Sequence, residues 1–189
     1  MPQKSPWYLD SVGGDRVLVT SWEMAYNCMD CGCLRAGSQN GSESMIHTAR
    51  SLRETEALAE ELAAGLQRGD FVALRGDLGA GKTAFARGLV RGLGSRAPVR
   101  SPSFTLMRIY ADGRLPVYHF DAYRLAGPDE LDALDFAEYA EGDGVCLVEW
   151  PERIEDALPP DRTEVRIEGS ADEPRRITVE RRKGTAWSS

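Results

Sequence analysis

One stretch of the sequence has the residue types and spacing needed to hold a phosphate chain: GDLGAGKT, residues 76–83. It matches the pattern G-x-x-x-x-G-K-[ST] at every required position. Glycines let the backbone adopt positive φ angles, so successive N–H groups can point toward phosphate oxygens. Lys82 adds a charge that can reach the β- and γ-phosphates, and Thr83 adds a hydroxyl for a magnesium ion. This motif, a P-loop, predicts a nucleotide site.

Two acidic residues each end an apolar run, in a position where a carboxylate can reach a ligand. Asp121 follows the run VYHF, and Glu149 follows the run VCLV. In open α/β sheets the carboxyl ends of the strands face the ligand crevice. A carboxylate there can bind magnesium or position the attacking water. Either acid could instead cap a helix or pair with an arginine, and Arg124 and Arg153 are the candidate partners.

The segments around the P-loop have the order that the motif requires. Residues 70–75 form a short apolar run typical of a strand, and apolar residues recur at helical spacing after Thr83. A further helix is predicted upstream, beginning at Ser51. Ser51 is suited to be its N-cap, with Glu54 three residues later as in a capping box, and Gly69 stops the helix.

The downstream pattern alternates between strands and helices. Residues 101–125 predict two strands around the turn ADGR, residues 127–140 a helix, and residues 144–150 a buried strand that contains Cys146. The alternating segments TEVRIEG and RRITVERR then predict an antiparallel hairpin. This arrangement indicates an α/β fold of the P-loop NTPase type, a three-layer domain. Its sheet is expected to be mixed and partly parallel, with a C-terminal antiparallel hairpin.

Composition limits the classes of protein that need consideration. At 189 residues the chain suits one domain, or one domain with an appendage. Its 30 acidic and 23 basic residues give a net charge of −7, which argues against a broad nucleic-acid-binding surface. No apolar run approaches the roughly 18 residues of a membrane span, and the start lacks the apolar region of a secretory signal. We therefore expect a cytoplasmic protein, an environment in which its four cysteines stay reduced.

Residues 1–44 differ from the rest of the chain. They show no sustained periodicity and end in the polar run GSQNGSES, so we expect an N-terminal extension over 1–44 and a P-loop domain over 45–189. Cys28, Cys31 and Cys33 could hold zinc with a fourth ligand. However, no second ligand pair follows at the usual spacing, and a metal site is not favoured.

The P-loop alone does not determine the reaction. GTPases usually carry an N-K-x-D element, and no asparagine follows Asn40, so a GTPase is disfavoured. A small-molecule kinase would use an arginine-rich lid. Several arginines follow the P-loop, but their spacing is equally typical of a solvated helix face. They are Arg87, Arg91, Arg96 and Arg100.

Four motifs, GDLGAGKTAFARGL, SPSFTL, HFDAYRL and LVEWPERI, occur in this order at suitable spacing. In this combination the chain closely resembles the TsaE family over about residues 51–179. Members of that family are small bacterial ATPases that serve in making the threonylcarbamoyladenosine modification of tRNA. The family often has threonine where Ser103 stands, a departure that keeps a hydroxyl. The extension 1–44 has no counterpart in this pattern.

The resemblance implies a role for individual residues. Thr83 and Glu149 would hold Mg²⁺, Asp121 would be needed for hydrolysis, and Trp150 would lie beside the nucleotide. Thr55 would lie near the nucleotide base, and the segment SPSFTL would sense the γ-phosphate. The ATP phosphates would be bound by Asp77, Leu78, Gly79, Ala80, Gly81, Lys82 and Thr83.

The resemblance also implies partners, the paired proteins TsaB and TsaD, whose complex the ATP cycle of the family resets between turnovers. Nothing in composition or spacing indicates direct contact with tRNA, and the acidic balance fits a protein partner. Two alternatives stay open at this point. One is a small-molecule kinase with Asp121 as the base for an acceptor hydroxyl, and the other is a nucleotide-dependent binding module with negligible hydrolysis.

Overall fold

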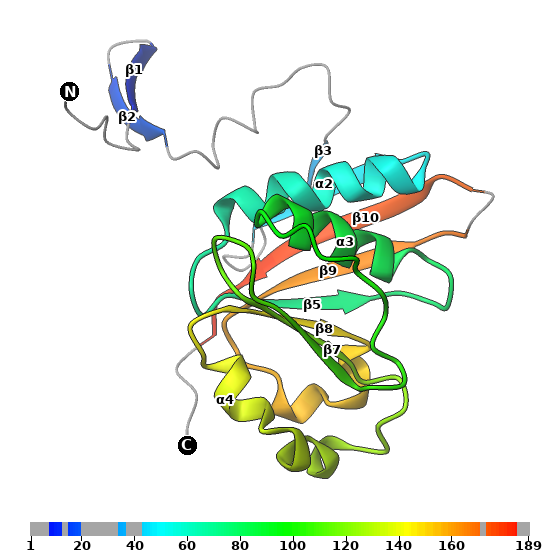
Figure 1. Ribbon diagram of the computed structural model, residues 1–189. Coiled ribbons are helices and arrows are strands. Elements are labelled where there is room, and N and C mark those ends of the chain that lie inside the picture. Colours follow the sequence, from blue (N-terminus) through cyan, green and yellow to red (C-terminus); the bar gives the residue numbers. More distant parts are fainter. Residues whose placement is uncertain (1–7, 13–14, 20–33, 37–42, 171–172, 185–189) are drawn as a thin grey trace. The chain divides into compact units, whose positions relative to one another are not determined.

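The computed structural model of the protein describes residues 8–12, 15–19, 34–36, 43–170 and 173–184 (Figure 1). The chain divides into two compact units, residues 1–32 and 33–189. In the first unit, β1 (Tyr8–Val12) and β2 (Asp15–Val19) form an antiparallel hairpin. The second unit holds the P-loop and the segments SPSFTL, HFDAYRL and LVEWPERI.

The second unit is built on one sheet, whose strands have the order β3-β4-β10-β9-β5-β8-β7-β6. The strands β9, β5, β8 and β7 run parallel to their neighbours in this set, whereas β10, β4, β3 and β6 pair antiparallel. The sheet is therefore mixed, and the last two strands along the chain, β9 and β10, form an antiparallel hairpin, as predicted. In chain order the strands are β3 (Leu34–Ala36), β4 (Glu43–Ala49), β5 (Phe71–Arg75), β6 (Met107–Tyr110), β7 (Val117–Asp121), β8 (Val145–Glu149), β9 (Arg162–Glu168) and β10 (Arg175–Arg182).

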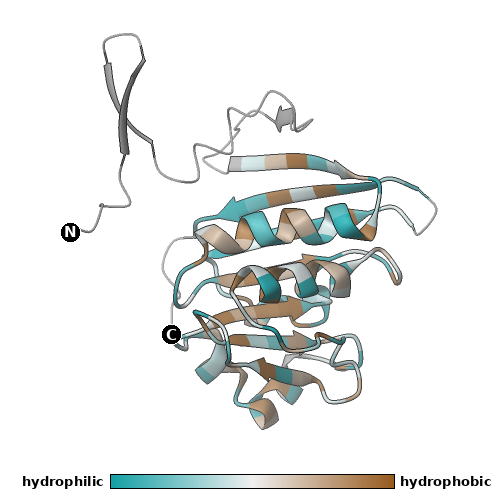
Figure 2. Cartoon of the chain, turned by 45° about the horizontal axis from the view of Figure 1, so that its top comes forward, coloured by the Kyte–Doolittle hydropathy of each residue, from teal (hydrophilic) through white to brown (hydrophobic). Residues whose placement is uncertain are grey.

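Two helices, α2 (Leu52–Gly65) and α3 (Lys82–Gly92), lie side by side and pack against each other (Figure 1). Their approach is close because α3 carries a glycine at the contact: a Cβ at Gly88 would overlap the backbone oxygen of Glu56. Ser51 caps α2 as predicted, since its hydroxyl accepts from the N–H of Glu54 at 3.1 Å. Figure 2 shows hydrophobic and hydrophilic residues on both helices, as expected for helices with one buried face.

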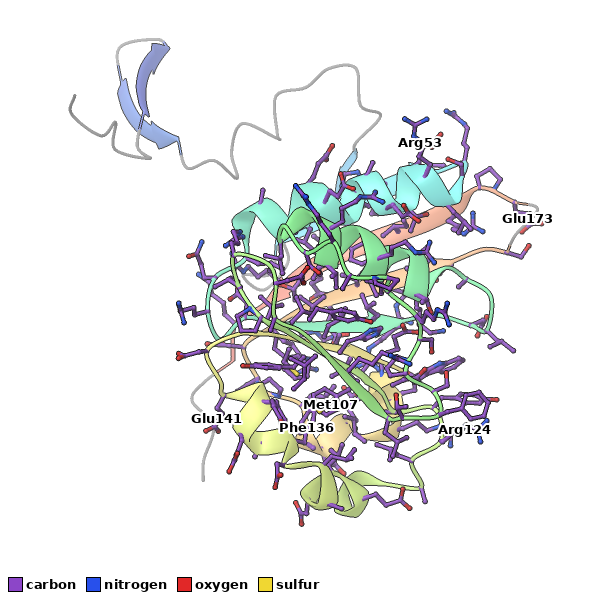
Figure 3. All side chains as sticks on the ribbon, viewed as in Figure 1. Arg53, Met107, Arg124, Phe136, Glu141 and Glu173 are labelled. Carbon is purple, nitrogen blue, oxygen red and sulfur yellow. The ribbon has the colours of Figure 1, made fainter. Side chains whose placement is uncertain are left out.

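The opposite face of the sheet carries an apolar cluster formed with the segments after β7 and β8. Phe71, Phe120 and Cys146 from the strands pack there with Phe136, and Met107 packs against the cluster (Figure 3). Cys146 is a buried small apolar residue here, as predicted.

The prediction of one helix over residues 127–140 is wrong in detail. The segment forms a 3₁₀ helix, Pro128–Leu134, followed by a short α4, Phe136–Ala140. Asp135 separates them with φ 50°, a left-handed backbone conformation that ends one helix and starts the next. The interruption lets Leu131 and Phe136 both enter the apolar cluster.

The sequence pattern did not reveal β4, which begins at Glu43 and joins the sheet between β3 and β10. The division of the chain at residue 44 stays a prediction. Cys28, Cys31 and Cys33 lie outside the described residues. None of the described helices combines the length and apolarity needed to cross a membrane.

Candidate nucleotide-binding site

The P-loop and both predicted carboxylates meet at one edge of the sheet, where the parallel strands β5, β8 and β7 end. Glu149 pairs with Leu74 on one side and with Asp121 on the other. Paired residues of a parallel sheet point to the same face, so the strands present both carboxylates together. Arg124 lies on the loop after β7 at this edge, on the side of the molecule away from Glu141 (Figure 3). A ligand crevice at the carboxyl ends of parallel strands is the arrangement expected for this fold class.

Thr83 of α3 and Glu149 of β8 form the first element of the site. The Thr83 hydroxyl donates to the Glu149 carboxylate, with oxygen separations of 3.2 and 3.3 Å. His119, fully buried on β7, places its Nε2 2.9 Å from the same carboxylate. Oxygen ligands of this kind are those that Mg²⁺ prefers, so Thr83 and Glu149 fit a magnesium site with His119 orienting the carboxylate.

Lys82 is buried and folded back over its own loop. Its Nζ donates to the carbonyls of Gly76 and Asp77, at 2.5 and 2.9 Å, and lies 3.6 Å from the centre of the Trp150 ring. Burial lowers the pKa of Lys82 from its ordinary value, and the charges of the nearby acids, Glu149 foremost, oppose that shift. These contacts hold the Lys82 ammonium group beside the P-loop backbone.

Asp121 is held by the segment that contains SPSFTL. Its Oδ2 accepts hydrogen bonds from the hydroxyls of Ser101 and Ser103, both at 2.7 Å, and its Oδ1 accepts from the N–H of Tyr123 at 3.0 Å. The two serine hydroxyls are also 2.6 Å apart. Asp121 therefore links the end of β7 to the loop that precedes β6.

Neither carboxylate has an arginine partner within the described residues. Asp121 binds hydroxyl and backbone groups, and Glu149 binds a hydroxyl and an imidazole. Two of the arginines after the P-loop form ion pairs with α2: Arg87 and Arg91 both bind Glu56. This matches the helix-face interpretation of those arginines, although Arg87 also borders the cavity described next.

These side chains surround a cavity of about 540 Å³, a size typical of small-molecule sites. Several of the predicted site residues line it together: Leu78, Gly79, Gly81, Lys82, Thr83, Asp121, Glu149 and Trp150. The other predicted residues do not line it. Asp77 is exposed and its carbonyl accepts from Lys82, and Ala80, within the same loop, is buried. Thr55 is fully buried on α2, where its hydroxyl donates to the carbonyl of Ser51 at 3.3 Å.

The rim of the cavity carries exposed apolar side chains. Leu78 on the P-loop is 82% exposed and Phe104 in SPSFTL is 86% exposed. The guanidinium of Arg124 lies over the Phe104 ring, 4.4 Å from its centre, and Tyr123 packs against Trp150 at 4.9 Å. Exposed apolar patches are found at ligand-binding grooves and at surfaces that another protein covers.

Sequence reasoning assigned no role to His119, which lies two residues before Asp121 on β7. The signal was present: strand residues two apart share a face, so a strand that directs Asp121 toward the P-loop also directs His119 toward it. Arg175 gave no such signal, because its contact with the P-loop joins residues 95 positions apart.

A family model described as threonylcarbamoyl adenosine biosynthesis protein TsaE matches residues 49–177. The chain belongs to the TsaE family. The tRNA threonylcarbamoyladenosine biosynthesis protein TsaE of Bacillus subtilis (strain 168) is 48% identical over 125 residues, 66% of this chain and 78% of that protein. Its namesake in Streptomyces coelicolor is 45% identical over 130 residues, 65% of this chain and 86% of that protein.

A solved structure supports the same assignment. The crystal structure of Bacillus subtilis YdiB is 39% identical to this chain, with a TM-score of 0.66, and the match covers 77% of this chain and 90% of that one. The predicted family and the predicted P-loop α/β fold are both confirmed. The P-loop, SPSFTL, Asp121 and Glu149 all lie within the residues that the TsaE model matches.

Proposed function

We propose that this protein binds ATP with Mg²⁺ in the cavity above the P-loop and hydrolyses the nucleotide. One observation carries the proposal: Lys82 and Thr83 at the start of α3, Glu149 of β8 and Asp121 of β7 come from three segments and line a single cavity at the carboxyl ends of parallel strands. Each has the chemistry that phosphoryl transfer needs, a cation, a hydroxyl and two carboxylates. The N-terminus of α3, which begins at Lys82, adds its partial positive charge.

The side chains that line the cavity have different roles in this proposal. Lys82 exchanges its carbonyl partners, Gly76 and Asp77, for phosphate oxygens, which are stronger acceptors because they are charged. Thr83 and Glu149 hold Mg²⁺, which neutralises charge on the phosphates when bound. Trp150 packs beside Lys82 and excludes water from that side of the site.

Asp121 serves hydrolysis, and the serines govern when it can do so. A carboxylate that accepts two serine hydroxyls and a backbone N–H has few lone pairs left for a water molecule. Displacement of Ser101 and Ser103, which belong to the γ-phosphate-sensing segment, frees Asp121 to orient the attacking water. Slow turnover by the protein alone follows from this arrangement.

We further propose that the ATP cycle supports threonylcarbamoyladenosine modification of tRNA by acting on the TsaB–TsaD complex in the cytoplasm. Family membership and the names of the relatives support this role. The exposed apolar rim around Leu78 and Phe104 supports a protein partner rather than an RNA partner, and the net charge of −7 agrees. The proposed role does not require this protein to contact tRNA directly.

Phosphate release from ATP, measured with and without TsaB–TsaD, tests the proposal. We expect slow magnesium-dependent release by the protein alone and faster release with the partners, with no added acceptor. Arg68→Ala is a matched control, because Arg68 makes an exposed ion pair with Asp143 and does not line the cavity. Turnover that requires a small-molecule acceptor would indicate a kinase. ATP binding without release in either condition would indicate a binding module.

A further inference from the structure

Arg175, the first residue of β10, lies directly beneath the P-loop. It is 3% exposed, and its Nε–H donates to the carbonyl of Ala80 at 2.9 Å. A Cβ built on Gly81 would lie 3.2 Å from the same Nε, so the arginine side chain fills the space under this peptide. The residue belongs to the C-terminal hairpin, far along the chain from the phosphate motif.

The geometry of the peptide bond gives this contact a consequence inside the cavity. A trans peptide holds its C=O and its N–H in one plane, pointing to opposite sides. The peptide between Ala80 and Gly81 directs its carbonyl down onto Arg175. The N–H of Gly81 must then point the opposite way, and Gly81 lines the nucleotide cavity.

Gly81 itself has no local means of fixing this orientation. Its φ of 113° lies where glycine is favoured because it lacks a Cβ, and it caps α3 without any side-chain hydrogen bond. A flexible peptide at this position could turn its carbonyl toward the cavity, where an oxygen would repel phosphate. The Nε–H of Arg175 holds the Ala80 carbonyl and so removes that freedom.

The rest of the hairpin supports the loop in the same way. A Cβ on Gly76, at the other end of the P-loop, would overlap the carbonyl oxygen of Ile167 on β9. The β9–β10 hairpin thus contacts both ends of the loop, Gly76 through a backbone oxygen and Gly81 through Arg175. The hairpin therefore supports the P-loop on the side that faces away from the cavity.

We propose that Arg175 is a positioning residue for the nucleotide: its Nε–H holds the carbonyl of Ala80 away from the cavity and so presents the N–H of Gly81 to the phosphates. The inference rests on the proposed function, and it adds a residue outside the P-loop motif. The role belongs to a donor at the position of Nε rather than to the positive charge.

Three substitutions separate these contributions, because their side chains reach the same depth with different chemistry. Gln places an amide nitrogen at the position of the arginine Nε and so keeps a donor without the charge. Met places a methyl group there and removes both. Lys keeps the charge but has carbon at that position, with its donor one bond further out. Arg176→Met, at the exposed neighbouring position, is the matched control.

Two measurements apply to each variant: ATP affinity, and the Ala80 ¹³C′ and Gly81 N–H resonances of the nucleotide-free protein. We expect Arg175→Met to shift both resonances and to weaken ATP binding about tenfold. The ATP affinity of Arg175→Lys should fall as much as that of Arg175→Met, whereas the affinity of Arg175→Gln should stay within about threefold of wild type. Arg175→Met also leaves the Ala80 carbonyl without its donor, so the melting temperature of each variant is compared with its ATP affinity.

Several outcomes would overturn the inference. Unchanged ATP affinity in a folded Arg175→Met protein removes the role altogether. If Arg175→Lys retains ATP affinity and Arg175→Gln loses it, the contribution of Arg175 comes from its charge. Loss in all three variants together with a lower melting temperature assigns it to packing. If the wild-type protein binds no ATP, the proposed function fails as well, whereas equal binding by wild type and Arg175→Met defeats this inference alone.

Discussion

Asp121 and Glu149 lie opposite each other at the last register position that β7 shares with β8. Both are 2% exposed, yet their partners differ. Glu149 binds Thr83 of α3 and His119, whereas Asp121 binds the serines of the loop before β6. Two adjacent carboxylates therefore connect to separate parts of the molecule, the P-loop helix and the predicted γ-phosphate-sensing segment. We expect their substitution to cause different defects.

Glu149→Ala should weaken magnesium-dependent ATP binding as well as hydrolysis. The substitution removes the carboxylate that bonds to the Thr83 hydroxyl and leaves His119 Nε2 without that partner. ATP titrations with Mg²⁺ and with EDTA measure the effect, and the difference between them should shrink by about tenfold or more. Binding of Mg²⁺–ATP at wild-type affinity would contradict the assignment.

Asp121→Ala should spare most of the nucleotide affinity and lower turnover. The loss is expected to be about 10²-fold, the scale for removing a positioned acid–base group. Phosphate release in the presence of TsaB–TsaD, alongside an ATP titration of the same preparation, measures both quantities. Full turnover with this variant would show that Asp121 serves only to hold Ser101 and Ser103.

Lys82→Ala should weaken ATP binding, because it removes the cation that faces the phosphates from the mouth of the P-loop. We expect a loss of about tenfold or more, as for other charge-assisted contacts to phosphate. Isothermal titration with ATP measures it, and the far-ultraviolet circular dichroism of the variant checks that it is folded. Unchanged affinity and turnover in a folded variant would count decisively against the site.

Glu164 should make stability depend on pH. Burial by itself would raise the pKa of Glu164, but hydrogen bonds from Arg75 and Arg162, at 2.7 and 2.6 Å, outweigh it, and the net shift is downward from 4.5. The folded state thus holds the carboxylate ionised to a lower pH than the unfolded chain does. Its stabilisation is fully present above the ordinary glutamate pKa and is lost as pH falls through the lowered folded value.

Urea unfolding of wild type and Glu164→Gln measures this contribution. At pH 7 the variant should be less stable by about 2 kcal/mol, because Arg75 and Arg162 lose their charge-assisted hydrogen bonds to Glu164 and keep only bonds to more exposed acids such as Glu155. The difference should shrink as the pH is lowered below 4.5, the ordinary glutamate pKa. Asp143→Asn, which alters only an exposed ion pair with Arg68, is the control. A difference that stays constant over this pH range would refute the explanation.

Removal of residues 1–44 should leave ATP binding and the melting temperature almost unchanged. The strand β4 keeps its pairing with β10 from Met45 to Ala49, and the cavity lining begins at Leu52. Thermal unfolding and an ATP titration of the shortened chain test this. A tenfold loss of affinity, or a chain that does not fold, would place the extension within the domain.

Local chemistry made much of this protein predictable. The phosphate motif needs glycines, a lysine and a threonine at fixed spacing, and hydrophobic periodicity marked the strand before it and the helix after it. Ser51 could be identified as a cap because its bond to Glu54 spans only three residues. The break at Asp135 in the helix predicted over residues 127–140 could not be predicted, because it accompanies the tertiary packing of Leu131 and Phe136 into one cluster.

The sequence by itself determined the P-loop motif and the order of the elements around it, since these depend on neighbours along the chain. Only the tertiary structure decided which groups surround them. Thr83 meets Glu149 across 66 positions, and Arg175 meets Ala80 across 95. Such contacts are set by strand order and register, which no local pattern encodes, because the free energy of pairing distant strands comes from the whole packed sheet.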